Sequence, residues 1–146
     1  MSDRFIGIDL GGTNVAAGVV DTEGKVVARH ATPLGRPKTQ AEVLERIYAA
    51  AEGTLAEAEL KSGDVRALGI VTPGTLNIAE GVVVKASNLP EWENVPLVKL
   101  LEDRLGIPTV LENDANAAAW GEYWVGAGRD VRSLVMLTLG TGIGGG

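Results

Sequence analysis

The sequence of 146 residues contains no cysteine. Disulfide bonds, thiolate metal ligands and a cysteine nucleophile are therefore excluded within this chain. The chain also lacks an excess of positive charge, because 19 acidic residues against 13 basic ones give a formal net charge of −6. Recognition of DNA, RNA or an anionic membrane needs a basic surface. Neither nucleic acid nor a membrane is therefore expected as a partner.

Long apolar runs are missing as well. No stretch approaches the roughly 20 residues that a membrane-spanning helix needs, and the first ten residues lack the basic and then apolar order of a signal peptide. These features predict a cytoplasmic protein. Hydrophobic residues nevertheless make up 45% of the chain, enough to bury the core of one domain.

Glycine, in contrast, is abundant: the chain has 20, and the last three residues are all glycine. This end, Leu139 to Gly146, directly follows an apolar segment that is typical of a strand. Domains rarely stop in such a loop. We therefore expect the 146 residues to be part of a longer protein.

The hydrophobic pattern predicts strands alternating with helices after an initial meander. A T-x-x-E capping box at Thr39 and Glu42 begins the first helix, and Ser62-Gly63 closes it. Helices are expected at 40–61, 96–105 and 115–125, and strands at 4–10, 15–20, 26–31, 66–72, 109–111 and 133–139, with a β-hairpin over 75–86. This order predicts an α/β domain with a mixed sheet that opens with a three-strand antiparallel meander.

The first candidate site is the segment from Asp9 to Thr13, at the end of the first strand. Gly11 and Gly12 let backbone N–H groups approach an anion, the Thr13 hydroxyl adds a donor, and Asp9 can hold a hydrated divalent cation such as Mg²⁺. The residues thus fit phosphate and metal binding. An ordinary glycine-rich hairpin turn explains them equally well.

A second glycine loop follows the last predicted strand. Gly140, Gly142 and Gly145 match the spacing of a dinucleotide-binding fingerprint, but that fingerprint opens a helix and is followed by an acidic residue about 20 positions later. We therefore reject it. A strand followed by a glycine loop occurs near both ends of the chain, and two phosphate loops facing one another predict a cleft between two lobes.

The third candidate site is Glu112-Asn113-Asp114-Ala115-Asn116, at another strand end. A carboxylate there could accept a hydroxyl proton during attack on a γ-phosphoryl group. Plain N-capping of the following helix is the simpler interpretation. The loops at 73–75 and 87–89 are expected mainly to form turns, and a role in ligand binding is the weaker interpretation. His30 is expected on a surface strand rather than as a catalytic base, and packing is expected for three tryptophans, Trp92, Trp120 and Trp124.

Five motifs occur together in one order: Asp9-x-Gly-Gly-Thr13, Gly69-x-x-x-Pro73-Gly74, Asn88-Leu89-x-x-Trp92, the segment 112–118 and the segment 139–146. In this combination the chain resembles the amino-terminal half of ROK-family sugar kinases, among which glucokinase is the commonest activity. The resemblance implies the actin-like, ribonuclease H-like ATPase fold. It places an actin-like lobe at 1–115, and a crossover helix and the opening strand of an incomplete second lobe at 116–146.

The resemblance also implies ATP-dependent phosphorylation of a hexose or N-acetylhexosamine by a homo-oligomer, a dimer or tetramer. Asp114 matches the catalytic base. The first phosphate motif comprises Asp9, Gly11, Gly12 and Thr13, with Asp9 near Mg²⁺. The second comprises Gly140, Thr141, Gly142, Gly144 and Gly145. The sugar is lined by Asn113 and Asp114 and, less directly, by Gly74, Ser87 and Asn88.

Family members continue with a zinc cluster and an adenosine-binding lobe, so the resemblance allows zinc only in the carboxyl-terminal half, and the 146 residues alone are expected to be inactive. Two other functions fit the resemblance. One is a sugar-sensing transcriptional regulator of the ROK type, against which the acidic balance argues. The other is a glucokinase that uses polyphosphate as its donor.

Overall fold

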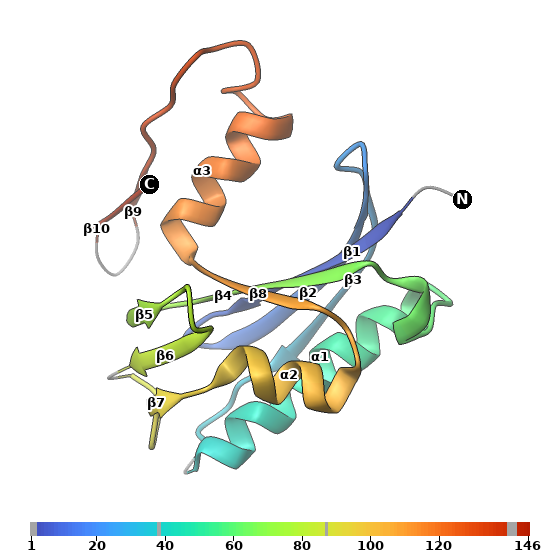
Figure 1. The fold of residues 1–146 in the computed structure, drawn as a ribbon, viewed down its shortest axis with the longest axis vertical. Coiled ribbons are helices and arrows are strands. Elements are labelled where there is room, and N and C mark those ends of the chain that lie inside the picture. Colours follow the sequence, from blue (N-terminus) through green and yellow to red (C-terminus); the bar gives the residue numbers. More distant parts are fainter. Residues whose placement is uncertain (1–2, 38, 87, 140–142) are drawn as a thin grey trace.

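The computed structural model describes residues 3–37, 39–86, 88–139 and 143–146. A five-stranded mixed sheet forms its centre, with strand order β3-β2-β1-β4-β8 (Figure 1). The first three strands pair antiparallel, whereas β1 pairs parallel with β4, and β4 with β8. The predicted meander and mixed sheet are thereby confirmed. The strands are β1 (Arg4–Leu10), β2 (Asn14–Asp21), β3 (Val26–Pro33), β4 (Ala67–Thr72) and β8 (Thr109–Asn113).

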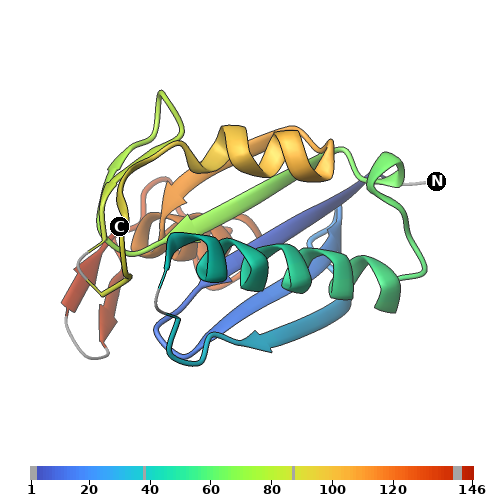
Figure 2. The ribbon, with the colours of Figure 1, turned by 90° about the horizontal axis from the view of Figure 1, so that it is seen from below.

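One face of this sheet carries two helices, α1 (Gln40–Glu57) and α2 (Leu97–Leu105), which lie across it in Figure 2. Side chains of β1 alternate between the two faces, so that Ile6, Ile8 and Leu10 are buried under the helices while Gly7 and Asp9 face the other side, where they are only partly covered. The alternation places Asp9 on the face away from the core.

Helix α1 begins as predicted but ends earlier. The Thr39 hydroxyl accepts a hydrogen bond from the Glu42 N–H at 3.3 Å. The predicted end at residue 61 is wrong, because Glu59 adopts a left-handed conformation with φ of 56°. The Leu60 N–H then donates to the Leu55 carbonyl at 2.9 Å, which closes the helix with a Schellman motif. A short 3₁₀ turn, η1 (Ser62–Asp64), follows.

A small antiparallel sheet follows β4. Its first two strands, β5 (Thr75–Asn77) and β6 (Val82–Lys85), form the expected hairpin. Its third strand, β7 (Glu93–Val95), was not predicted, since three residues are too few to show a period. Helix α2 then ends at Gly106, whose left-handed conformation matches the predicted stop.

Helix α3 (Asp114–Val125) leaves the end of β8 on the side of the sheet opposite α1 and α2 (Figure 1). An open, mostly apolar groove of about 1280 Å³ lies between α3 and the sheet. Trp120 and Trp124 line it and are 66% and 51% exposed, so packing was the wrong expectation for these two. Trp92 is buried as expected, at 2% exposure.

The last two strands, β9 (Leu137–Leu139) and β10 (Ile143–Gly145), form a hairpin of their own. The predicted strand 133–139 is therefore too long. Its apolar side chains are exposed rather than buried, since Leu137 is 67% and Leu139 79% exposed. β9 pairs only with β10 in the described part of the chain, outside the central sheet. None of the helices described is both long and apolar enough to cross a membrane.

Candidate functional site

The carboxyl ends of the three parallel strands meet at one edge of the central sheet. The pairing register sets Asp9 beside Val71 and Val71 beside Glu112, and it sets Thr72 beside Asn113. The candidate sites after β1, after β4 and after β8 are therefore neighbours, although they are distant in sequence. In open α/β sheets, ligands bind at this edge.

The first glycine loop is the connection between β1 and β2. Its backbone is held by a hydrogen bond from the Gly11 N–H to the Asn14 carbonyl at 3.0 Å, and by one from the Leu34 N–H to the Thr13 carbonyl at 2.8 Å. Gly12 is exposed, and a Cβ atom placed on it would meet no other atom within 4 Å. Nothing in the described fold therefore requires glycine at this position for space, and the room above it is open to a ligand.

The turn from β8 into α3 shows which residue caps the helix. The Asn113 Oδ1 atom accepts hydrogen bonds from the Ala115 N–H at 2.9 Å and from the Asn116 N–H at 3.3 Å, so Asn113 is the N-cap. Asp114 stands in the first turn with an exposed side chain, and its Oδ1 atom accepts from the Ala115 N–H at 2.8 Å. Asn113 thus caps the helix, and Asp114 is not needed as the N-cap residue. The Asp114 carboxylate is accessible at the helix N-terminus, and the helix dipole favours negative charge at that end.

The Asp9 carboxyl senses both its burial and a neighbouring acidic residue. Partial burial raises the pKa of the Asp9 carboxyl above its ordinary value, and the negative charge of Asp114 raises it further. The neighbouring ends of β1, β4 and β8 thus bring two carboxylates to one edge of the sheet. The described residues contain no group of three or more histidine, cysteine or acidic side chains that could cage a metal. Mg²⁺ suits such a place, since it keeps several waters and is bound by one or two carboxylates together with phosphates.

Gly74, at the start of the loop after β4, has a structural reason to be glycine. Its φ is 109°, and a Cβ atom would collide with the Lys85 carbonyl oxygen and approach the Ala86 Cα to 3.1 Å. The loop thus packs backbone against backbone onto β6. Asn88 is exposed on the connection between β6 and β7. Ser87 lies outside the described residues.

Gly74→Ala is expected to lower the free energy of unfolding of the intact protein by roughly 2–5 kcal/mol, because it adds a backbone clash to a strained φ. The midpoint of urea denaturation measures the loss. Gly63→Ala is the matched control, since a Cβ there meets nothing within 4 Å and the φ is not left-handed. Equal midpoints for the two variants would contradict the packing argument.

The hairpin β9–β10 brings part of the second glycine loop to the same place. A Cβ atom on Gly144 would come within 3.2 Å of the Ala115 Cβ, and one on Gly146 within 3.0 Å of the Asn116 Cα. This hairpin therefore lies against the first turn of α3, beside Asp114. Gly145 belongs to β10. Three other predicted residues of this loop, Gly140, Thr141 and Gly142, lie outside the described part of the chain.

His30 lies on β3, away from the strand ends. Its Nδ1 atom is 2.7 Å from the Glu57 Oε1 atom of α1, and its ring occupies the space above Gly53, where a Cβ atom would collide with it. The side chain is about one third exposed. The expectation of a surface strand residue is confirmed, and the packing explains a glycine within α1.

Comparison with known proteins places these features in a family. The model of the ROK family matches residues 5–146. The chain is 44% identical to a glucokinase of Streptomyces coelicolor over 141 residues, which are 97% of this chain and 42% of that protein. The chain thus spans less than half the length of the curated glucokinases that it matches.

Solved structures of similar proteins agree with this family assignment. A ROK family glucokinase from Streptomyces griseus in complex with glucose and AMPPNP superposes with a TM-score of 0.84 at 42% identity, covering 97% of this chain and 43% of that one. An inorganic polyphosphate/ATP-glucomannokinase from Arthrobacter sp. strain KM has a TM-score of 0.84 at 36% identity, covering 98% and 57%. These similarities confirm the actin-like ATPase fold that the sequence motifs imply.

Proposed function

Because this chain belongs to the ROK family, we propose that the protein containing it transfers the γ-phosphoryl group of ATP to a hydroxyl group of a hexose. The observation that carries the proposal is that β1, which ends with Asp9 and the first glycine loop, and β8, which leads into Asp114, reach the same edge of the sheet, where the β9–β10 hairpin packs against the first turn of α3. Glucose and AMPPNP, an ATP analogue, bound to a similar kinase support both substrates.

In this proposal Asp114 accepts the proton of the attacking sugar hydroxyl. Phosphoryl transfer depends mainly on positioning and on neutralising charge, so an accessible and fixed carboxylate is the chief requirement on the acceptor side. Asn113 beside it, with Gly74, Ser87 and Asn88, lines the sugar. Of these, Asn113 has its side-chain oxygen committed to the helix cap, which leaves its amide N–H groups for a sugar oxygen.

On the donor side, backbone N–H groups of the loop from Gly11 to Thr13 bind phosphate oxygens, and the second glycine loop, Gly140, Thr141, Gly142, Gly144 and Gly145, binds them as well. Asp9 holds hydrated Mg²⁺, whose charge would offset that of the phosphates. The raised pKa of Asp9 fits this role, since a nearby cation would favour the carboxylate form and relieve the repulsion from Asp114.

A panel of sugars tested with the intact protein is the direct experiment. ATP and polyphosphate are each supplied with glucose, N-acetylglucosamine, N-acetylmannosamine, allose and fructose, and transferred phosphate is measured. We expect ATP-dependent phosphorylation of at least one of them. Sugar binding without transfer from either donor would contradict the proposal and favour the sugar-sensing regulator. Transfer from polyphosphate alone would contradict ATP as the donor and identify polyphosphate in its place.

A further inference from the structure

Glu112 bridges the end of β8 and the first turn of α3. Its Oε1 atom accepts one hydrogen bond from the Asn113 N–H at 2.8 Å and another from the Asn116 side-chain amide at 3.1 Å. One carboxylate oxygen thus holds a residue on each side of Asp114. We name this arrangement of Glu112, the Asn113 N–H and Asn116 the corner brace.

The corner brace adds to the hydrogen bonds that the helix cap makes in this turn. Ala115 is buried, at 3% exposure, and its N–H is shared by the side chains of Asn113 and Asp114. The Asn116 side chain, in contrast, links the first helical turn back to the strand through Glu112. The direction in which the Asp114 carboxylate points therefore depends on the brace as well as on the helix cap.

Glu112 is a third acidic residue beside a site that already holds two carboxylates. It lies in the cross-strand row of Asp9, with Val71 between them. A negative charge there would repel the phosphate groups of the donor. A carboxylate without a structural role would therefore weaken donor binding. The two hydrogen bonds of Glu112 provide such a role, because its Oε1 atom accepts from both the Asn113 N–H and the Asn116 side-chain amide.

We propose that Glu112 is a positioning residue, which acts through Asn116 and the Asn113 N–H to aim the Asp114 carboxylate at the acceptor hydroxyl. Glu112 itself does not contact the substrate. The inference rests on the proposed function, because it assumes the role of Asp114 as the base. The motif Glu112-x-x-x-Asn116 has the spacing of a helical pair, but it crosses a strand end, where helical spacing does not by itself predict contact.

Two variants of the intact protein separate positioning from direct chemistry. Glu112→Ala is expected to lower kcat for hexose phosphorylation about 10–100-fold, since a displacement near 1 Å can cost about 10²-fold, while KM for the sugar stays within about threefold. Glu112→Gln keeps an oxygen acceptor in place and is expected to restore kcat to within about threefold of the wild type. A glutamine variant as impaired as the alanine variant would overturn the proposal, because the charge itself would then be required.

The partner residue provides a second test. Asn116→Ala is expected to lower kcat on the same scale as Glu112→Ala, and the double variant is expected to be no worse than the more impaired single one. Additive losses would show that the two side chains act independently, which would overturn the corner brace as a unit.

A matched control lies at the other end of the same strand. The Glu102 Oε1 atom accepts a hydrogen bond from the Thr109 N–H at 2.9 Å, where β8 begins. Glu102→Ala therefore also removes a carboxylate that anchors β8, but far from Asp114. We expect lower thermal stability with unchanged kcat. A loss of kcat equal to that of Glu112→Ala would mean that any loosening of β8 lowers activity, and would overturn the specific role.

Hydrogen exchange gives a readout that needs no catalysis. In Glu112→Ala the amides of residues 113–117 are expected to exchange faster than in the wild type, and in Glu112→Gln at about the wild-type rate. Unchanged exchange in the alanine variant would overturn the brace whatever the activity. If the wild type phosphorylates no hexose, the proposed function fails. In that case faster exchange would leave the brace as a structural contact only, and the positioning role would be overturned.

Discussion

Asp114→Asn in the intact protein is expected to lower kcat for sugar phosphorylation by about 10²–10⁴-fold, the contribution typical of a positioned general base. Asparagine has nearly the same shape, and its side-chain oxygen can still accept the hydrogen bond that Asp114 now accepts from the Ala115 N–H at 2.8 Å. The helix cap at Asn113 is untouched. KM for the sugar is therefore expected to change by less than about threefold, which places the loss in the chemical step.

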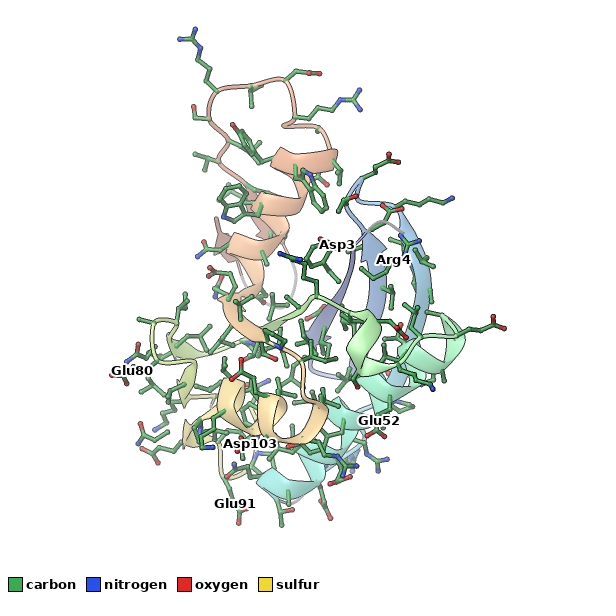
Figure 3. The ribbon with its side chains drawn as sticks, turned by 45° about the vertical axis from the view of Figure 1, so that its right-hand side comes forward. Asp3, Arg4, Glu52, Glu80, Glu91 and Asp103 are labelled. Carbon is green, nitrogen blue, oxygen red and sulfur yellow. The ribbon has the colours of Figure 1, made fainter. Side chains whose placement is uncertain are left out.

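The matched control is Asp103→Asn. Asp103 is an exposed carboxylate on α2, on the face of the sheet opposite α3, and it pairs with Lys99 at 2.6 Å (Figure 3). Its replacement removes the same charge and should leave kcat unchanged. A wild-type kcat in Asp114→Asn, or an equal loss in both variants, would exclude Asp114 as the base.

Local signals explain why much of the fold could be predicted. Strand β1 alternates cleanly between a buried and an exposed face, α2 ends at a glycine that adopts the left-handed conformation, and α3 begins at an Asx cap. Each of these is set by residues within a few positions of one another. The prediction failed where the deciding residue was of an unusual type, as at the end of α1, where Glu59 rather than a glycine is left-handed.

Burial of the last strands could not be predicted because it depends on partners. The apolar residues of 133–139 have the composition of a buried strand, yet β9 pairs only with β10 among the described residues and stays exposed. Likewise, Trp120 and Trp124 are large apolar side chains of the kind that pack in a core, but they border an open groove. Composition shows that a side chain is apolar, and only the tertiary arrangement shows whether another element covers it.

The candidate site was predictable as separate loops but not as an arrangement. Each loop had a simpler explanation as a turn or a cap. The strand register is what sets Asp9 in one row with Val71 and Glu112, at the edge of the sheet where Asp114 follows β8. The corner brace is local in sequence, but it depends on the turn from β8 into α3, across which Glu112 contacts Asn116.

Asp9→Asn is expected to lower kcat on the order of 10²-fold or more, the scale on which removal of one preorganised electrostatic group acts. It is also expected to raise thermal stability at pH 7. Burial and then the charge of Asp114 raise the pKa of Asp9 above its ordinary value of 3.8, so the folded state binds this proton more tightly than the unfolded state does. The stabilising contribution is present below the unfolded pKa and is lost as the pH rises through the folded pKa. At pH 7, above the unfolded pKa, the Asp9 carboxyl therefore disfavours folding, and asparagine removes that effect.

Asp21→Asn provides a control of opposite sign on the neighbouring strand. The N–H group of Lys25, with smaller contributions from that of Glu23 and from the Arg4 guanidinium, holds the pKa of Asp21 below its ordinary value. Its stabilising contribution is present above the unfolded pKa and is lost as the pH falls through the folded pKa.

Thermal unfolding of the intact protein at pH 7 should thus give a higher Tm for Asp9→Asn and a lower Tm for Asp21→Asn, with normal kcat in the latter. The Asp9 difference should vanish well below pH 3.8, where this carboxyl is protonated in both states, and the Asp21 difference should shrink as the pH falls from 3.8 through the lower folded pKa of Asp21. A lower Tm for Asp9→Asn at pH 7 would mean that Asp9 stabilises the fold, and its charge would then no longer indicate a position kept for ligand binding at the expense of stability.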